Sequence, residues 1–271
     1  MNASTADLSA AQFGAVSTLV HRVCGINLHA GKFELVRARL ASRIRELGIP
    51  DFDGYFALLD RDATELGRLV DLLTTNKTSF FREPKHFELL RQRVIPELRV
   101  PGRPLRVWSA GCSSGEEPYS LAMTLHADLA GDAEPRILAT DISARMLAHA
   151  RRGVYSEETM YEVPATLRQQ HFRLVSAGPP RSYAVSDRLR ASIRFAQLNL
   201  MDRWPMKGPF DLVCCRNVMI YFDKETQQRL VERFWEMITP GGYFFVGHSE
   251  SFAALSHAFS YVQPAVYRRP A

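Results

Sequence analysis

Apolar residues recur every three or four positions between residues 10 and 73, which is the period of amphipathic helices. Turn-forming residues interrupt this stretch and divide it into about four helices. They lie at Gly25, Gly31, Gly48-Ile49-Pro50 and Asp53-Gly54. The pattern predicts a small all-α domain in this part of the chain.

The pattern changes beyond residue 100, where Pro101-Gly102-Arg103-Pro104 interrupts the chain. Short apolar runs then alternate with helical stretches, which is typical of βαβ units in a parallel sheet. The predicted strands are residues 105–109, 136–140, 193–198, 210–215 and 243–246. Residues 172–185 predict an antiparallel hairpin inserted after the second strand, and residues 259–262 and 265–268 an antiparallel edge pair. The sequence therefore predicts an α/β sheet preceded by a helical domain.

The composition is that of a globular protein with its own core. The chain has 271 residues, 46% of them hydrophobic and 23% charged. No apolar run approaches the ~18 residues of a membrane helix, and residues 1–13 lack the basic cluster and apolar core of a signal peptide. We therefore expect a cytoplasmic protein. The formal charge of +5 permits nucleic acid as a partner without requiring it.

Cysteine usage predicts neither a disulfide framework nor a zinc site. The four cysteines, at 24, 112, 214 and 215, form no C-x-x-C pair, and two of them lie within an apolar run. We expect buried, reduced thiols and no bound metal.

A glycine-containing turn follows the first predicted strand and leads into a helix. Gly111 and Gly115 have the spacing G-x-x-x-G, which is neither the dinucleotide fingerprint nor the P-loop. Glu116 and Glu117 open the helix, and two carboxylates there would repel a phosphate from the helix N-terminus. The turn therefore favours a cationic ligand.

A carboxylate also follows the second predicted strand. Asp141 is placed where it can accept both hydroxyls of a ribose. A nucleoside with a positively charged appendage, S-adenosylmethionine, satisfies these carboxylates together. The alternative is that Glu116, Glu117 and Asp141 only cap helices.

Five segments, taken in order, carry a family resemblance. They are Thr74-Thr-Asn-Lys-Thr-Ser-Phe-Phe-Arg-Glu83, Val107-Trp-Ser-Ala-Gly-Cys-Ser-Ser-Gly-Glu-Glu-Pro-Tyr-Ser120, Ala139-Thr-Asp-Ile142, Cys215-Arg-Asn-Val-Met-Ile-Tyr-Phe-Asp223 and Gly247-His-Ser-Glu250. On these residues the chain resembles the chemotaxis receptor methyltransferases, the CheR family, nearly end to end. Members of this family methylate glutamate side chains of chemoreceptors with S-adenosylmethionine and release S-adenosylhomocysteine.

The resemblance implies a fold and its division into domains. We expect a Rossmann-like class I methyltransferase sheet with an inserted small antiparallel β-subdomain, preceded by a small all-α domain. The expected boundaries are residues 1–75 for the helical domain and 76–271 for the methyltransferase domain, with the hairpin insertion at about 172–192.

The resemblance also implies a set of site residues. Arg82 and Tyr221 are the expected catalytic residues. Glu117 would take the methionine amino group, although Glu116 beside it is an alternative, and Asp141 would bind the ribose. The remaining expected cofactor contacts are Asn76, Thr78, Arg82, Gly111, Asn199, Leu200, Arg216 and Asn217. A metal is not expected.

The substrate contact implied by the resemblance is a basic helix. Arg39 and Arg43 lie one turn apart on one helix face and would meet the cytoplasmic helical region of a chemoreceptor, although a solvated surface is the alternative. We expect a cytoplasmic monomer recruited to receptor arrays, with no nucleic acid partner and no membrane insertion. Two other functions stay open: a methyltransferase for another substrate, and a non-catalytic module that binds the cofactor and regulates a partner.

Overall fold

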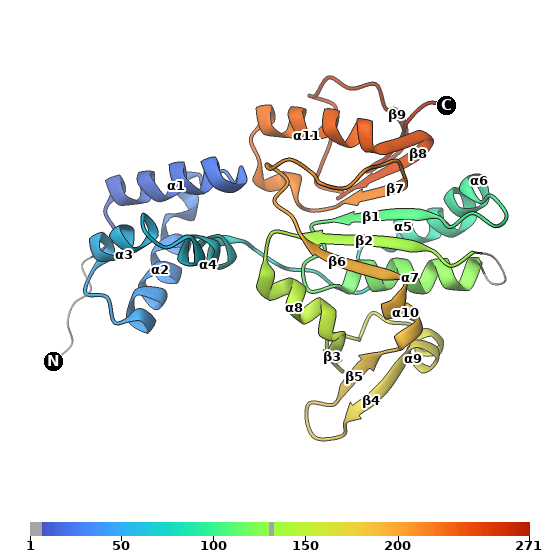
Figure 1. Ribbon diagram of the computed structural model, residues 1–271, viewed down its shortest axis with the longest axis horizontal. Coiled ribbons are helices and arrows are strands. Elements are labelled where there is room, and N and C mark those ends of the chain that lie inside the picture. Colours follow the sequence, from blue (N-terminus) through green and yellow to red (C-terminus); the bar gives the residue numbers. More distant parts are fainter. Residues whose placement is uncertain (1–6, 130–132) are drawn as a thin grey trace. The chain divides into compact units, whose positions relative to one another are not determined.

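The computed structural model describes residues 7–129 and 133–271 and contains two compact units (Figure 1). The first unit comprises Met1–Thr75 and Tyr221–Asp223. The second comprises Asn76–Ile220 and Lys224–Ala271. Each unit has its own buried core and is described separately.

The first unit is helical, as the sequence predicts. Its helices are α1 (Ala10–Cys24), the 3₁₀ turn η1 (Ala30–Lys32), α2 (Phe33–Leu47), α3 (Phe52–Leu59) and α4 (Ala63–Leu73). Ser9 and Gln12 form a capping box at the start of α1, while Asp51 and Asp62 cap α3 and α4. Gly25 and Gly48 end α1 and α2 in the left-handed conformation that glycine adopts without strain.

The core of this unit comes from the recurring apolar positions. Val16 and Val20 of α1, Val36 and Leu40 of α2, and Leu69 of α4 are fully or almost fully buried. Residues 221–223 join the unit through an antiparallel bridge from Phe222 to Ile26. A segment distant in sequence therefore belongs to the helical unit.

The second unit is built on a mixed sheet. Seven described strands lie in the order β6-β2-β1-β7-β8-β10-β9, and the first five run parallel. They are β1 (Arg106–Ala110), β2 (Arg136–Asp141), β6 (Ile193–Gln197), β7 (Phe210–Cys215), β8 (Ile238–Val246), β9 (Ser260–Gln263) and β10 (Val266–Arg268). The chain order reverses between β1 and β7, and ligands bind at such a switch point in open parallel sheets.

Helices cover the sheet on both sides. Figure 1 shows α11 (Lys224–Met237) on one side, where it packs against β8, and α7 (Glu116–Asp128) and α8 (Ala144–Arg152) on the other, against β2 and β6. The remaining helices and turns are α5 (Pro84–Leu89), the π-helical turn η2 (Leu90–Val94), α6 (Ile95–Leu98), α9 (Ala165–His171), α10 (Asp187–Ala191) and η3 (Met219–Tyr221). The prediction of an α/β sheet is therefore confirmed.

A separate antiparallel sheet contains β3 (Val154–Ser156), β4 (Phe172–Ser176) and β5 (Ser182–Val185) in the order β3-β5-β4. Strands β4 and β5 form the hairpin that the sequence predicts. Strand β3 lies outside the predicted insertion, because three residues are too few to show an alternating pattern. Strand β8 begins at Ile238, before its predicted start at Tyr243, because Gly241 and Gly242 interrupt the apolar run in the sequence. The pairing of β8 with β7 is also irregular here, between Phe210 and Leu212 of β7.

The four cysteines are free and buried, as the sequence predicts. Burial raises the pKa of Cys24 to about 11 and holds the pKa values of Cys112, Cys214 and Cys215 well above their ordinary range. These thiols are core residues and poor nucleophiles.

Candidate cofactor site

The site residues gather where β1 and β7 end. Gly111 directly follows β1 and Arg216 directly follows β7, so both lie at the switch point of the sheet. Gly111 has a φ of 86°, and a Cβ there would lie 2.4 Å from Cγ2 of Val218. Glycine is therefore required both for the backbone conformation and for the close approach of the segment after β7.

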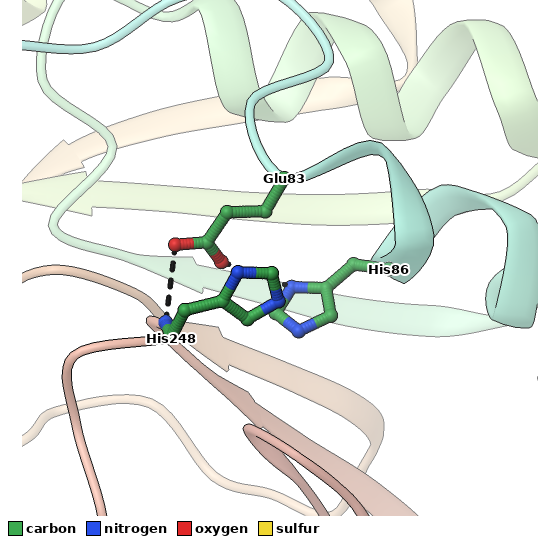
Figure 2. A group of neighbouring side chains, drawn as sticks. All are labelled: Glu83, His86 and His248. Carbon is green, nitrogen blue, oxygen red and sulfur yellow. Dashed lines mark hydrogen bonds and ion pairs between the residues drawn. The ribbon is translucent and has the colours of Figure 1, made fainter.

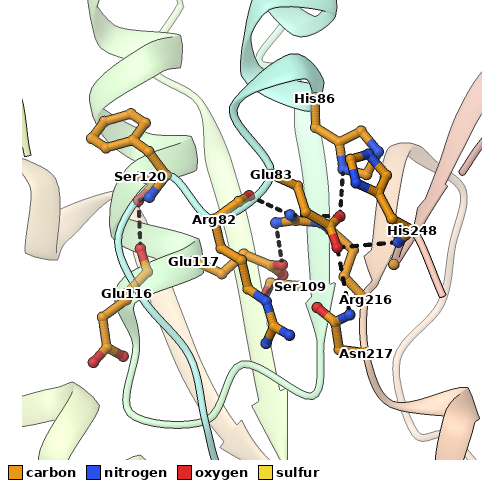
Figure 3. A network of polar contacts seen from close by, with 12 residues as sticks. Arg82, Glu83, His86, Ser109, Glu116, Glu117, Ser120, Arg216, Asn217 and His248 are labelled. Carbon is orange, nitrogen blue, oxygen red and sulfur yellow. Dashed lines mark hydrogen bonds and ion pairs between the residues drawn. The ribbon is translucent and has the colours of Figure 1, made fainter. Parts of the chain in front are cut away.

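Arg216 is the centre of a polar network that Figure 3 shows. Its Nη1 donates to Glu117 Oε2 and its Nη2 to Glu83 Oε2, each at 3.0 Å. Nη2 also donates to the backbone carbonyl of Arg82. The Arg216 side chain is only 4% exposed, so one buried guanidinium connects the segment before α5, the start of α7 and the end of β7.

The electrostatics of this network favour its charged forms. Burial opposes the charge of Arg216, but Glu117 and Glu83 outweigh it and raise the Arg216 pKa. Burial also opposes the charge of Glu83, but Arg216 and the backbone N–H of His248 hold the Glu83 pKa below its ordinary value. A carboxylate on each side of a buried guanidinium satisfies the condition for keeping an ion pair in the interior.

The two glutamates at the start of α7 have different surroundings. Glu117 accepts a hydrogen bond from the Ser109 hydroxyl at 2.7 Å in addition to its bond with Arg216. Glu116 is buried and accepts from the Ser114 hydroxyl at 2.7 Å, and burial, only partly offset by Ser114, raises its pKa. Glu117 therefore belongs to the network around Arg216, whereas Glu116 does not.

Asp141, the last residue of β2, is buried with its carboxylate fixed by the backbone. Oδ2 accepts from the N–H of Ser113 and Oδ1 from the N–H of Ser143, each at 2.8 Å. Ser113 lies in the turn after β1 with a φ of 48°, so its amide points at the end of the neighbouring strand.

The segment 76–83 is anchored to the same edge of the sheet. The Ser113 hydroxyl donates to the Asn76 carbonyl at 3.0 Å, and the Phe81 N–H donates to the Ser120 hydroxyl at 2.9 Å. Arg82 is half-buried and donates from Nη1 to the Lys77 carbonyl at 2.9 Å. The predicted residues Asn76, Thr78 and Arg82 thus belong to a segment that contacts the turn after β1 and the start of α7.

The loop after β6 carries the two residues predicted to lie near an adenine. The Asn199 side-chain oxygen accepts from the Met201 N–H at 3.0 Å, which closes a local turn. The Leu200 carbonyl accepts from Arg233 Nη1 at 2.6 Å and from Trp204 Nε1 at 3.2 Å. Because the guanidinium of Arg233 also lies 3.9 Å from the centre of the Trp204 ring, α11 holds this loop in place.

Two further residues of the site, Glu83 and Glu250, have no role predicted from the sequence. The carboxylate of Glu250 is buried and accepts backbone N–H bonds from Asn217 at 2.8 Å and Gly247 at 2.5 Å. It supports the left-handed backbone of Asn217, which has a φ of 59°. Both glutamates end motifs that are visible in the sequence, but Glu83 pairs with Arg216 and Glu250 with Asn217, which lie more than thirty residues away in the chain.

The other predicted residues belong to the helical unit. The hydroxyl of Tyr221 lies 3.4 Å from the Thr75 carbonyl. Arg43 donates to both oxygens of Glu65, which is 4% exposed, and Arg39 donates to the carbonyls of Leu72 and Thr74. The structure therefore gives both arginines partners within their own unit, while Asn217, Arg216 and Glu117 come together in the other.

The charges at the edge of the sheet fit the cofactor that the sequence suggested. The Nε of Arg216 is buried and has no hydrogen-bond partner among the described residues, so the guanidinium keeps a donor for an anionic group. S-adenosylmethionine carries a sulfonium, an ammonium and a carboxylate, and an excess of acidic groups favours the two cations. The carboxylates here are Glu83, Glu116, Glu117 and Asp141, against the guanidinium groups of Arg82 and Arg216.

Comparisons with known proteins identify the family of the chain. Residues 76–267 match the family described as the CheR methyltransferase SAM-binding domain, and residues 11–74 match the CheR methyltransferase all-alpha domain. The chain is 44% identical over 259 residues to "Chemotaxis protein methyltransferase 2" of Pseudomonas aeruginosa, which covers 94% of this chain and 91% of that protein. It is 41% identical over 266 residues to "Chemotaxis protein methyltransferase" of Escherichia coli, which covers 96% and 91%.

The matched domains are those of an S-adenosylmethionine-dependent methyltransferase. The chain belongs to the CheR methyltransferase family. In the described part of the chain, no helix combines the length and the apolar character that crossing a bilayer requires.

Proposed function

We propose that this protein transfers a methyl group from S-adenosylmethionine to glutamate side chains in the cytoplasmic helical region of chemoreceptors. The products are the glutamate methyl ester and S-adenosylhomocysteine. The observation that carries the proposal is the pairing of Arg216 with Glu117 and Glu83 at the switch point of a CheR-family sheet. The similarity to chemotaxis protein methyltransferases supplies the substrate class.

Different residues of the chain bind different groups of the cofactor. Glu117, or Glu116 beside it, takes the ammonium, and Asp141, held at the end of β2 by the backbone N–H groups of Ser113 and Ser143, accepts the ribose hydroxyls. The loop with Asn199 and Leu200 lies along the adenine. Gly111 lets the backbone approach, and the other contacts come from Asn76, Thr78, Arg82, Arg216 and Asn217.

The bound cofactor supplies a methyl group on a positively charged sulfur. A glutamate side chain has an ordinary pKa of about 4.3, so it arrives ionised and needs no general base. The protein's task is therefore to orient the reacting groups and exclude water. Arg82 has a planar guanidinium suited to a carboxylate, and Tyr221 has a hydroxyl that can orient one, so we assign the catalytic roles to these two residues.

The helical unit provides the receptor contact in this proposal. Arg39 of α2 donates to the carbonyls of Leu72 and Thr74, and Arg43 donates to Glu65 and Glu46. The N–H groups that these bonds do not use meet an acidic receptor helix. The protein acts in the cytoplasm as a monomer at receptor arrays, without nucleic acid.

The test mixes the protein with receptor-rich membranes and cofactor labelled in the methyl group. Label that base releases as methanol indicates a carboxyl ester, and the Arg82→Ala variant serves as the matched control with reduced incorporation. Base-stable label contradicts the proposal and favours a methyltransferase for another substrate. Binding of S-adenosylhomocysteine without any incorporation favours a regulatory module.

A further inference from the structure

Three side chains next to the network around Arg216 bring potential metal ligands together. One donor atom each from Glu83, His86 and His248 lies within 4.8 Å of the others (Figure 2). Glu83 directly precedes α5, His86 lies within α5, and His248 follows β8. The group therefore joins two segments that are far apart in sequence.

His86 is the unusual member of this group. Its side chain is 2% exposed, and neither Nδ1 nor Nε2 has a hydrogen-bond partner among the described residues. The nearest acidic oxygen, Oε2 of Glu83, lies 3.4 Å from Nδ1. A buried polar group without a hydrogen-bond partner destabilises the fold by about 1–3 kcal/mol. We therefore expect the buried imidazole of His86 to bind a ligand.

Glu83 is held in a way that suits a metal ligand. Its Oε2 accepts from Arg216 at 3.0 Å, and its Oε1 accepts from the His248 N–H at 3.1 Å. Carboxylates that bind metals are commonly fixed by a hydrogen bond from a second group, and Arg216 has that position here. Glu117, 3.0 Å from the same guanidinium, offsets part of the positive charge that faces an incoming cation.

His248 gives access to the group. Its ring is exposed and lies 5.1 Å from the ring of His86, centre to centre. Rotation of this exposed side chain brings its nitrogen toward the other two donors without moving the backbone. The buried ring of His86 is fixed by comparison, with the Phe245 ring 5.0 Å away.

We propose that Glu83, His86 and His248 bind a divalent transition-metal ion, Zn²⁺ or an ion with the same ligand preference. Imidazole favours Zn²⁺, Cu²⁺ and Ni²⁺ over Mg²⁺ and Ca²⁺, which prefer oxygen ligands. Three protein ligands leave a fourth position for water or another group. The expectation of no metal site rested on cysteine spacing and on the family resemblance, and neither shows that His86 and His248 lie side by side.

The test measures binding of Zn²⁺ to the full chain, stripped of metal and free of an affinity tag, by titration calorimetry. Bound Co²⁺ gives a second readout through its visible absorption. We expect one high-affinity ion per chain, and His248→Ala should weaken binding by at least about tenfold. Because His248 is exposed, this variant should fold normally. The matched control is Ser249→Ala, an exposed neighbour, which should bind like the unchanged protein.

A second variant separates this site from adventitious binding. His21 and Asp223 form another exposed imidazole–carboxylate pair, with 2.6 Å between Nε2 and Oδ2. His21→Ala should leave the high-affinity ion in place. Absence of high-affinity binding, identical isotherms for His248→Ala and the unchanged protein, or loss of the ion only in His21→Ala would overturn the proposal. Binding requires no turnover, so these outcomes are independent of the proposed methyl transfer.

Discussion

Glu83 and Arg216 form a buried ion pair with 3.0 Å between Oε2 and Nη2. Their side chains are 11% and 4% exposed, and 133 residues separate them in the chain. The pair links the segment that contains Arg82 to the end of β7. The segment before α5 and the edge of the sheet are therefore positioned together.

Replacing Glu83 by glutamine should destabilise this unit. The change removes one of the two carboxylates that balance Arg216 and leaves Glu117 as its remaining acidic partner. We expect a loss of about 1–3 kcal/mol in the free energy of unfolding, measured by urea denaturation. Glu88→Gln, on the exposed side of α5, should change stability by less than about 0.5 kcal/mol. Equal effects of the two substitutions would contradict the role of the pair.

Asp141 and Tyr221 should affect different steps. The carboxylate of Asp141 lies at the end of β2 in the proposed cofactor site, so Asp141→Ala should weaken S-adenosylhomocysteine binding by roughly tenfold or more in calorimetry. Tyr221→Phe keeps the ring and removes only the hydroxyl, so it should lower turnover at saturating cofactor with little change in affinity. Equal losses of affinity in both variants would refute this division.

The apolar pattern predicted the fold because burial dictates it. Every residue of β7 is buried, and the sequence predicted its bounds, 210–215, without error. Strand β3 was missed because its three residues carry no period, and the start of β8 was missed because two glycines interrupt it. Local pattern thus locates long elements and fails where an element is short or irregular.

The candidate site was predictable only in part. Asp141 and Gly111 follow predicted strands, so the topology of a parallel sheet locates them. Glu83 and Glu250 act through partners distant in sequence, which no local pattern reveals. For Arg43 the local pattern is misleading in another way. Its helical spacing predicts a surface cation, whereas in the fold it pairs with the buried Glu65.

Substitutions on α2 should separate structural from receptor-binding roles. Arg43→Ala leaves the carboxylate of Glu65 without its bidentate partner, so it should lower the melting temperature. Arg45→Ala, exposed on the same helix, is the control and should leave it unchanged. If Arg43 also binds the receptor, methylation at a temperature where both variants are folded should fall in Arg43→Ala and remain in Arg45→Ala. Unchanged methylation in both would contradict the receptor role.

The stability of the helical unit should fall in acid. The hydrogen bond from Arg43, together with that from Tyr55 and against the effect of burial, lowers the pKa of Glu65. A carboxylate whose pKa is lowered in the folded state stabilises the fold at pH values above its unfolded pKa of about 4.3. This stabilisation is lost as the pH falls through the folded pKa. Protection of α2 and α4 amides in hydrogen exchange, corrected for intrinsic rates, should therefore decrease below about pH 5.

Glu65→Gln is the variant that checks this origin. It should reduce the pH dependence of protection without abolishing it, because Asp62 remains. The backbone N–H groups of Thr64 and Glu65 lower the pKa of Asp62 in the same unit. An unchanged pH profile in Glu65→Gln would show that the buried pair does not control acid stability.

Gly111→Ala should be among the most damaging single-methyl additions at the edge of the sheet. The new Cβ would lie 2.4 Å from Cγ2 of Val218, and the φ of 86° is unfavourable for any residue with a side chain. The backbone contribution alone is about 1–2 kcal/mol. Urea denaturation should show a loss larger than this, because the clash adds to it. Gly178→Ala, where the nearest atom is the Ser176 hydroxyl oxygen at 3.9 Å, is the control and should have little effect.

The double variant Gly111→Ala/Val218→Ala isolates the two causes. Removing the Val218 methyl groups relieves the clash but not the backbone strain, so the double variant should recover part of the stability lost in Gly111→Ala, after correction for Val218→Ala alone. S-adenosylhomocysteine affinity should stay reduced in the double variant, because the turn after β1 still carries a side chain at the place where we propose that the backbone approaches the cofactor. Full recovery of both stability and affinity would mean that Val218, and not the backbone conformation, is the reason for glycine at this position.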